Sequence, residues 1–132
     1  MIPDKSGVIM TVTTLQSRMG SPMVGGYGPA MAAKEALTRD LSAELAPHGI
    51  RVVGLRPQGM PTTRTIKDAA ERRAAATGMT WEQFQGALAS RTHPRRLMTL
   101  EEMASMAAFL ASDKASGMTG TTVNLTMGSL DD

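Results

Sequence analysis

The chain has 132 residues, 42% of them apolar and 20% charged, a balance typical of one globular domain rather than of a disordered chain. Fourteen Lys and Arg residues against 12 Asp and Glu residues leave a net charge of +2, which argues against nucleic acid as the main partner. The absence of cysteine excludes disulfides and thiolate metal sites, and we expect no metal centre.

The N-terminal half of the chain predicts a strand, a long loop and a helix. No signal peptide and no 18-residue apolar stretch is found, so we expect a cytoplasmic protein with no membrane partner. A β-branched run predicts a buried strand over residues 7–14, and a loop rich in Gly, Ser and Pro follows to residue 26. A helix is expected over residues 29–46, where Leu37, Leu41 and Leu45 form one apolar stripe.

The remaining residues predict two more strands and three helices. A strand over 50–55 is followed by helices over 65–76, 81–89 and 100–112, and then by a strand over 121–126. The tail, Gly128 to Asp132, is expected to be frayed.

Strands that alternate with helices predict an α/β fold with a parallel sheet in a single domain over residues 1–132. About three parallel strands with flanking helices are few for such a sheet. At least one edge strand is therefore expected to be bare, as in one part of a larger α/β sheet.

Several separate blocks of the sequence resemble the short-chain dehydrogenase/reductase family. They lie at residues 32–39, 43–52, 109–113 and 119–120, in the family's order and spacing. The resemblance runs from about Gly7 to Gly128 and corresponds to the C-terminal half of that fold, the half that carries catalysis and substrate binding. It implies a partial Rossmann-type fold and an NAD(P)-dependent oxidoreductase.

The resemblance also implies three catalytic positions. Tyr27 matches the tyrosine that donates or accepts the proton as hydride moves, and Thr14, 13 residues earlier, stands where the family has a serine that polarises the substrate carbonyl. The phenol of a tyrosine has a pKa of about 10 in water. The family places a lysine close to it, because a positive charge favours loss of the proton. The same lysine also holds the nicotinamide ribose. Four residues after the tyrosine this chain has Met31, and Lys34, seven residues after it, takes the lysine's place.

The Tyr-x6-Lys spacing is similar to that of the divergent enoyl-acyl-carrier-protein reductase branch. Seven residues at about 100° each return to within roughly 20° of the same helical face, so Tyr27 and Lys34 share a side of the helix. That branch carries a further aromatic donor upstream of the tyrosine, and no aromatic precedes Tyr27. Carbonyl/alcohol and enoyl hydride transfer therefore both stay open.

The segment after the second strand resembles the family's Pro-Gly-x-Ile-x-Thr loop, which lines the nicotinamide. The resemblance implies cofactor contacts from Tyr27 and Lys34 and from this loop, through Pro57, Gln58, Gly59, Met60 and Thr62. Gln58 stands where the family usually has a glycine.

Residues 58–98 correspond to the substrate loop and lid of the family. Four basic residues in the turn after the third predicted helix could meet an anionic substrate or form a solvated basic turn: Arg91, His93, Arg95 and Arg96.

No part of the sequence resembles the glycine-rich turn that cradles the dinucleotide phosphates. NAD or NADP is implied as cofactor, yet we expect the chain alone to bind it poorly and to be inactive by itself. Three hypotheses stay open: part of a reductase that acts on a small-molecule substrate; a non-enzymatic module that pairs with an intact relative or a second copy through the helix at 29–46; and an unrelated small α/β binding domain.

Overall fold

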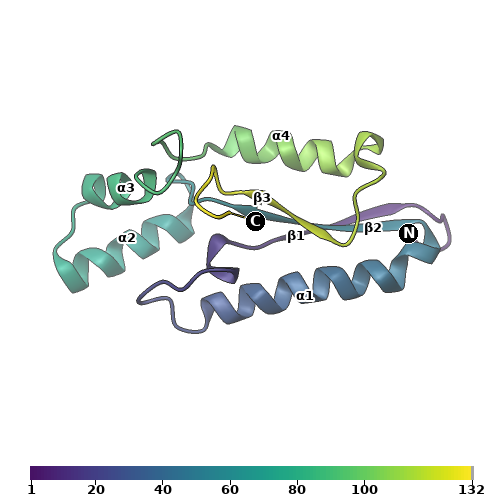
Figure 1. Cartoon of the computed structure of the whole chain (residues 1–132), viewed down its shortest axis with the longest axis horizontal. Coiled ribbons are helices and arrows are strands. Elements are labelled where there is room, and N and C mark those ends of the chain that lie inside the picture. The colour runs from purple at the N-terminus through teal and green to yellow at the C-terminus, as the bar shows by residue number, and fades with distance from the viewer. Residues whose placement is uncertain (132) are drawn as a thin grey trace.

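The computed structural model describes residues 1–131 and shows an α/β arrangement built on one three-stranded sheet (Figure 1). The three strands are parallel and lie in the order β1-β2-β3. The α/β fold with about three parallel strands and flanking helices, expected from the sequence, is confirmed. The elements are β1 (Gly7–Val12), η1 (Leu15–Ser17), α1 (Tyr27–Leu45), η2 (Ala46–His48), β2 (Ile50–Pro57), α2 (Arg64–Thr77), α3 (Trp81–Ala89), α4 (Leu100–Ala111), η3 (Asp113–Ala115) and β3 (Thr121–Leu125), where η marks a short 3₁₀ helix.

Helices cover both faces of the sheet and one of its ends. Figure 1 shows α1 against one face and α4 against the other, with α2 and α3 beyond the carboxyl ends of the strands. In the sheet, Gly7 of β1 lies opposite Ile50 of β2, and Val53 of β2 lies opposite Thr121 of β3. The three strands therefore end close to one another. The carboxyl ends of the three strands lie at the same end of the sheet, which is where ligands bind in open α/β sheets. None of the helices among the described residues is long and apolar enough to span a membrane.

The face of the sheet that meets α4 is apolar. Val53 and Leu55 of β2 are buried there with Leu110 of α4. Methionines fill the space around this cluster, among them Met10, Met103, Met106 and Met118. Since aromatic residues make up only 3% of the chain, the flexible thioether side chains supply volume that larger rings would otherwise provide.

The side of α1 that meets the opposite face of the sheet is mainly polar. The buried residues of α1 are Gly28, Glu35, Thr38 and Ser42. The Thr38 and Thr11 hydroxyls lie 2.7 Å apart, so that helix and strand are joined by a hydrogen bond. The apolar stripe predicted on this helix does not form the centre of the contact, because polar residues occupy it. Leu37 is 50% exposed, and Leu41 and Leu45 are half-buried.

At the centre of this polar face, Glu35 and Arg56 form a buried, two-pronged ion pair between α1 and β2. Arg56 donates from Nε to Oε1 of Glu35 at 2.8 Å and from Nη2 to Oε2 at 2.9 Å. Oε1 also accepts hydrogen bonds from the hydroxyls of Ser17 at 2.5 Å and Thr13 at 3.0 Å. The two charged side chains are only 3–4% exposed, so the network replaces the water that both ions have lost.

This network determines how the carboxyl group of Glu35 titrates. Burial by itself would raise the pKa of Glu35, but the hydrogen bonds from Arg56, Ser17 and Thr13 outweigh burial and lower it from 4.5 to about 2. A carboxyl group whose pKa is lowered by folding stabilises the folded state above its unfolded pKa, and that contribution is lost as the pH falls toward the folded pKa.

We therefore predict that the free energy of unfolding falls as the pH drops from about 4.5 toward about 2, with roughly 3 kcal/mol of the loss due to Glu35. Denaturant unfolding at a series of pH values measures it. Glu35→Gln should lower stability at pH 7 and flatten this acid limb. Asp68→Asn, in the exposed pair with Arg64, is the matched control and should change stability by less than about 0.5 kcal/mol. An unchanged acid limb in Glu35→Gln would contradict the assignment.

Candidate functional site

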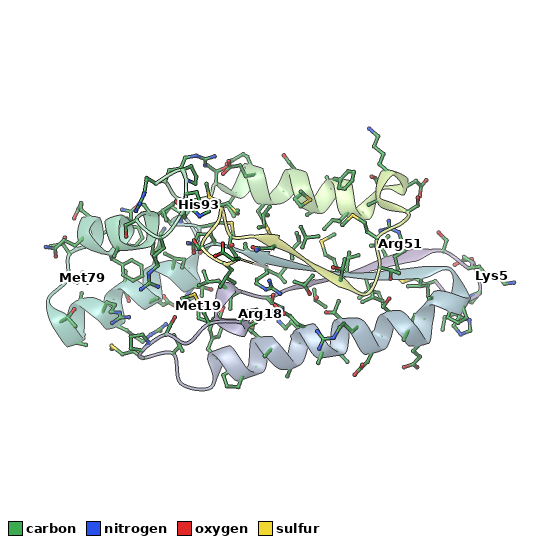
Figure 2. All side chains as sticks on the ribbon, viewed as in Figure 1. Lys5, Arg18, Met19, Arg51, Met79 and His93 are labelled. Atoms are coloured by element: carbon green, nitrogen blue, oxygen red, sulfur yellow. The ribbon has the colours of Figure 1, made fainter. Side chains whose placement is uncertain are left out.

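A cavity of about 530 Å³ lies where the loop after β1 and the start of α1 face helices α2 and α3. Figure 2 shows Met79, which lines it, at the turn between α2 and α3, beyond the carboxyl ends of the strands. Its walls are largely apolar. The lining residues are Thr14, Gln16, Ser21, Pro22, Met23, Val24, Tyr27, Thr65, Ile66, Ala69, Arg72, Arg73, Met79, Phe84, Ala87, Leu88 and Arg91.

Two of the three predicted catalytic residues line this cavity together. Thr14 follows β1 directly and precedes η1, and Tyr27 is the first residue of α1. The Tyr27 side chain is 39% exposed, so its ring is open to a ligand. The Thr14 hydroxyl donates a hydrogen bond to Oε1 of Gln16 at 2.5 Å, and Gln16 lines the same cavity. A ligand oxygen that took the place of this amide oxygen would therefore accept the hydrogen bond that the Thr14 hydroxyl now donates to Gln16.

Lys34 lies outside the lining of this cavity. Its Nζ donates a hydrogen bond to the backbone carbonyl of Val12, the last residue of β1, at 3.2 Å. β1 pairs with β2 alone among the described residues, and the Lys34 ammonium thus satisfies a carbonyl at the carboxyl end of β1. Met31, four residues after Tyr27, is half-buried and carries no charge.

The predicted nicotinamide loop begins with Pro57, which the structure places as the last residue of β2, and it does not line the cavity. Pro57 and Gln58 are buried, Gly59 and Met60 are half-buried, and Thr62 is exposed. The Gln58 amide is used internally, since its Oε1 accepts from the Gly59 backbone N–H at 2.8 Å. A Cβ on Gly59 would lie 2.8 Å from Cδ1 of Ile66, a cavity residue, so this glycine lets α2 approach the loop.

The C-terminal segment is held in place, so the frayed tail expected from the sequence is wrong for residues 128–130; Asp132 lies outside the described residues. Nε2 of Gln58 donates to Oγ of Ser129 at 2.7 Å, and that hydroxyl donates to the Arg91 carbonyl at 3.2 Å. The His93 backbone N–H donates to the Met127 carbonyl, and Figure 2 shows His93 beside the loop that follows β3. The tail thereby joins the loop after β2 to the loop after α3.

The four basic residues of the predicted turn have separate surroundings. Arg91 lines the cavity, whereas Arg96 pairs with Glu102 of α4 at 2.5 Å. The hydrogen bond from Arg96 lowers the pKa of Glu102 to about 2. Arg95 donates to the Ser90 carbonyl. Sequence reasoning missed Arg72 and Arg73, which α2 brings to the same cavity. The only signal in the sequence for these two arginines was their adjacent position on a predicted helix that leads away from the loop.

Comparison with known proteins identifies the family. Residues 1–129 match the family described as "Enoyl-(Acyl carrier protein) reductase". The chain belongs to the short-chain dehydrogenase/reductase family. It is 33% identical over 121 residues to (+)-borneol dehydrogenase 2 from Salvia officinalis, which covers 91% of this chain and 42% of that protein. It is also 33% identical over 130 residues to sorbitol-6-phosphate 2-dehydrogenase from Klebsiella pneumoniae, covering 97% of this chain and 49% of that protein.

Solved structures of short-chain dehydrogenase/reductases agree with this assignment. The crystal structure of sorbitol-6-phosphate 2-dehydrogenase from Erwinia amylovora matches with a TM-score of 0.90 at 26% identity, covering 100% of this chain and 52% of that one. The chain thus spans about half the length of the relatives it matches. The predicted family and the predicted partial correspondence to its fold are both confirmed.

The affinity for a dinucleotide cofactor depends strongly on a motif that binds its phosphates. Residues 1–131 contain no glycine-rich strand–turn–helix to cradle the dinucleotide phosphates. We expect the 132-residue chain to bind NADH and NADPH with a Kd no lower than roughly 1 mM. Isothermal titration calorimetry measures this, with the full-length Klebsiella relative as the control. A micromolar Kd for this chain would contradict it.

Proposed function

We propose that this chain supplies the catalytic and substrate-binding half of an NAD(P)-dependent short-chain dehydrogenase/reductase that interconverts a carbonyl compound and its alcohol. The observation that carries the proposal is the shared cavity of Thr14 and Tyr27 beyond the strand ends. The family typically uses NAD(P). Residues 58–98 would form its substrate loop and lid, and the cytoplasm stays our prediction for its compartment.

In this proposal the residues of the cavity act on the substrate oxygen. The Tyr27 hydroxyl gives a proton to the carbonyl oxygen during reduction and takes it back during oxidation. The Thr14 hydroxyl leaves Gln16 and donates a hydrogen bond to the same oxygen, where negative charge develops. The apolar wall formed by Ile66, Phe84 and Leu88 keeps water away from the reacting carbon.

The residues at the strand ends fit the nicotinamide end of the cofactor better than its phosphate end. Lys34 is the only lysine on α1, and its Nζ lies at the carboxyl end of β1, so it would hold the ribose hydroxyls after leaving the Val12 carbonyl. The loop of Pro57, Gln58, Gly59, Met60 and Thr62 would provide the wall beside the ring. A bound nicotinamide supplies or accepts the hydride. Enoyl reduction has less support, because no aromatic residue precedes Tyr27.

We predict that activity requires a dinucleotide-binding half supplied from outside this chain. The chain would be mixed with the separately produced N-terminal half of the Klebsiella relative, and NAD(P)H oxidation followed with a panel of carbonyl compounds. Tyr27→Phe should lower turnover by about 100-fold or more and Thr14→Val by about tenfold or more, because each removes a group that acts on the substrate oxygen. Thr14→Ser should retain activity.

Thr121→Val is the matched control, since it makes the same chemical change on an exposed residue at the opposite end of the sheet. Full activity in Tyr27→Phe, or equal effects of Thr14→Val and Thr121→Val, would overturn the proposed roles.

The position of Lys34 and the outer face of α1 favour a second candidate, a non-enzymatic module that pairs with an intact relative or with a second copy. Lys34 is engaged by Val12, and Leu37 is 50% exposed on the helix face turned away from the sheet. An apolar side chain exposed on a long helix is suited to packing against a partner helix.

This alternative predicts that the chain self-associates through α1. Sedimentation velocity at micromolar concentration should show an oligomer that Leu37→Glu converts to monomer, because a buried charge would oppose packing. Leu100→Glu, at a leucine of α4 exposed to a similar extent, is the control and should leave the oligomer intact. Equal behaviour of the two variants would remove the support for an α1 interface.

A further inference from the structure

Three arginines from two separate elements line the cavity that holds Thr14 and Tyr27. Arg72 and Arg73 are consecutive residues of α2, and Arg91 follows α3. No aspartate or glutamate lines the cavity among the described residues. The cavity therefore carries a concentration of positive charge, although the chain as a whole has a net charge of only +2.

Among the described residues, these three guanidinium groups have no carboxylate partner, in contrast to Arg56, Arg64 and Arg96. Arg56 is paired with Glu35, Arg64 with Asp68 and Arg96 with Glu102. In the part of the chain that the structure describes, Arg72 and Arg91 form no ion pair. Nη1 of Arg73 contacts the sulfur of Met23 at 3.7 Å, and Arg73 forms no ion pair with a described residue. Their planar, multiply donating groups remain available for a ligand anion.

Arg91 is also presented by a backbone that is held on both sides. Its N–H donates to the Leu88 carbonyl at 3.2 Å, and its carbonyl accepts from the Ser129 hydroxyl at 3.2 Å. Ser129 is in turn held by Gln58 at the end of β2. The hydrogen bonds from the tail thus fix the start of the Arg91 side chain relative to the sheet, which lowers the entropy cost of binding an anion.

The rest of the wall limits the size and character of the ligand. A volume of about 530 Å³ is in the range of small-molecule sites, and Ile66, Phe84 and Leu88 give the wall an apolar surface. We propose that the cavity binds a small carbonyl or alcohol compound that carries an anionic group, a phosphate or a carboxylate. Arg72, Arg73 and Arg91 hold the anionic group while the reacting oxygen meets Thr14 and Tyr27. The position of the reacting oxygen rests on the proposed function, whereas anion binding does not.

The test compares ligands that differ only in charge, with binding to the 132-residue chain followed by NMR chemical-shift titration. Fructose 6-phosphate is matched with fructose for the phosphate, and 4-oxopentanoate with 2-pentanone for the carboxylate. At least one anionic probe should bind about tenfold or more tightly than its neutral counterpart, and the pair that shows the difference identifies the anion. Equal affinities within both pairs would overturn the proposal.

Variants then locate the anion subsite. Arg72→Gln and Arg91→Gln should each weaken binding of the anionic probe about tenfold and leave the neutral probe unaffected. Arg64→Gln, on the same helix but outside the cavity, removes an equal charge and should change nothing. An equal loss in Arg64→Gln would show general charge attraction and overturn the subsite. Circular dichroism confirms folding of these exposed variants.

Tyr27→Phe separates this proposal from the proposed function. The variant lacks the proton donor but keeps all three arginines, so it should still bind the anionic probe about tenfold or more tightly than its neutral counterpart. If it does so while the redox assay shows no role for Tyr27, the proposed chemistry fails and the anion subsite stands. If charge discrimination is lost in Tyr27→Phe, the arginines are not the anion-binding groups.

Discussion

The buried pair of Glu35 and Arg56 is the interaction on which the arrangement of the site depends. It joins α1 to β2, and its carboxylate also takes hydrogen bonds from Thr13 at the end of β1 and from Ser17 in η1. One carboxylate thus holds four segments at the carboxyl ends of the strands. Removing one partner of such a pair leaves a buried charge uncompensated, which typically costs about 3–5 kcal/mol. Because Thr14 is next to Thr13, and Tyr27 begins the helix that carries Glu35, the network also fixes where the two cavity residues lie.

The two faces of the sheet are built by different physical means. On the α4 side, aliphatic residues and methionines bury apolar area, which stabilises the fold without demanding one particular geometry. On the α1 side, threonines, a serine and an ion pair meet, and each requires a partner at hydrogen-bond distance. The polar face therefore fixes the position of α1 along the sheet, and it leaves Leu37 of this helix exposed.

The cavity combines residues that different parts of the chain bring to one end of the sheet. Thr14 and Tyr27 come from the segment around β1 and α1, and the arginines come from α2 and the loop after α3. Gln58 and Ser129 connect these regions, since their hydrogen bonds run from the end of β2 through the tail to the Arg91 carbonyl. Gln58 thus has a structural role of its own in this chain.

The sequence alone determined the α/β class and the parallel strands through local periodicity, and the family through motifs spaced along a continuous chain. The same motif spacing singled out Thr14 and Tyr27, which line one cavity. The sequence also placed Lys34 on the same helix, but tertiary structure decided that its ammonium meets the Val12 carbonyl rather than the cavity. Helical periodicity shows that Leu37 and its neighbours share one face and that Glu35, Thr38 and Ser42 share another. It does not show which face meets the sheet, since that depends on partners such as Arg56 and Thr11 that lie far away in sequence. The contribution of Arg72 and Arg73 to the cavity and the ordering of the tail have the same origin, because both depend on how segments distant in sequence pack at the strand ends.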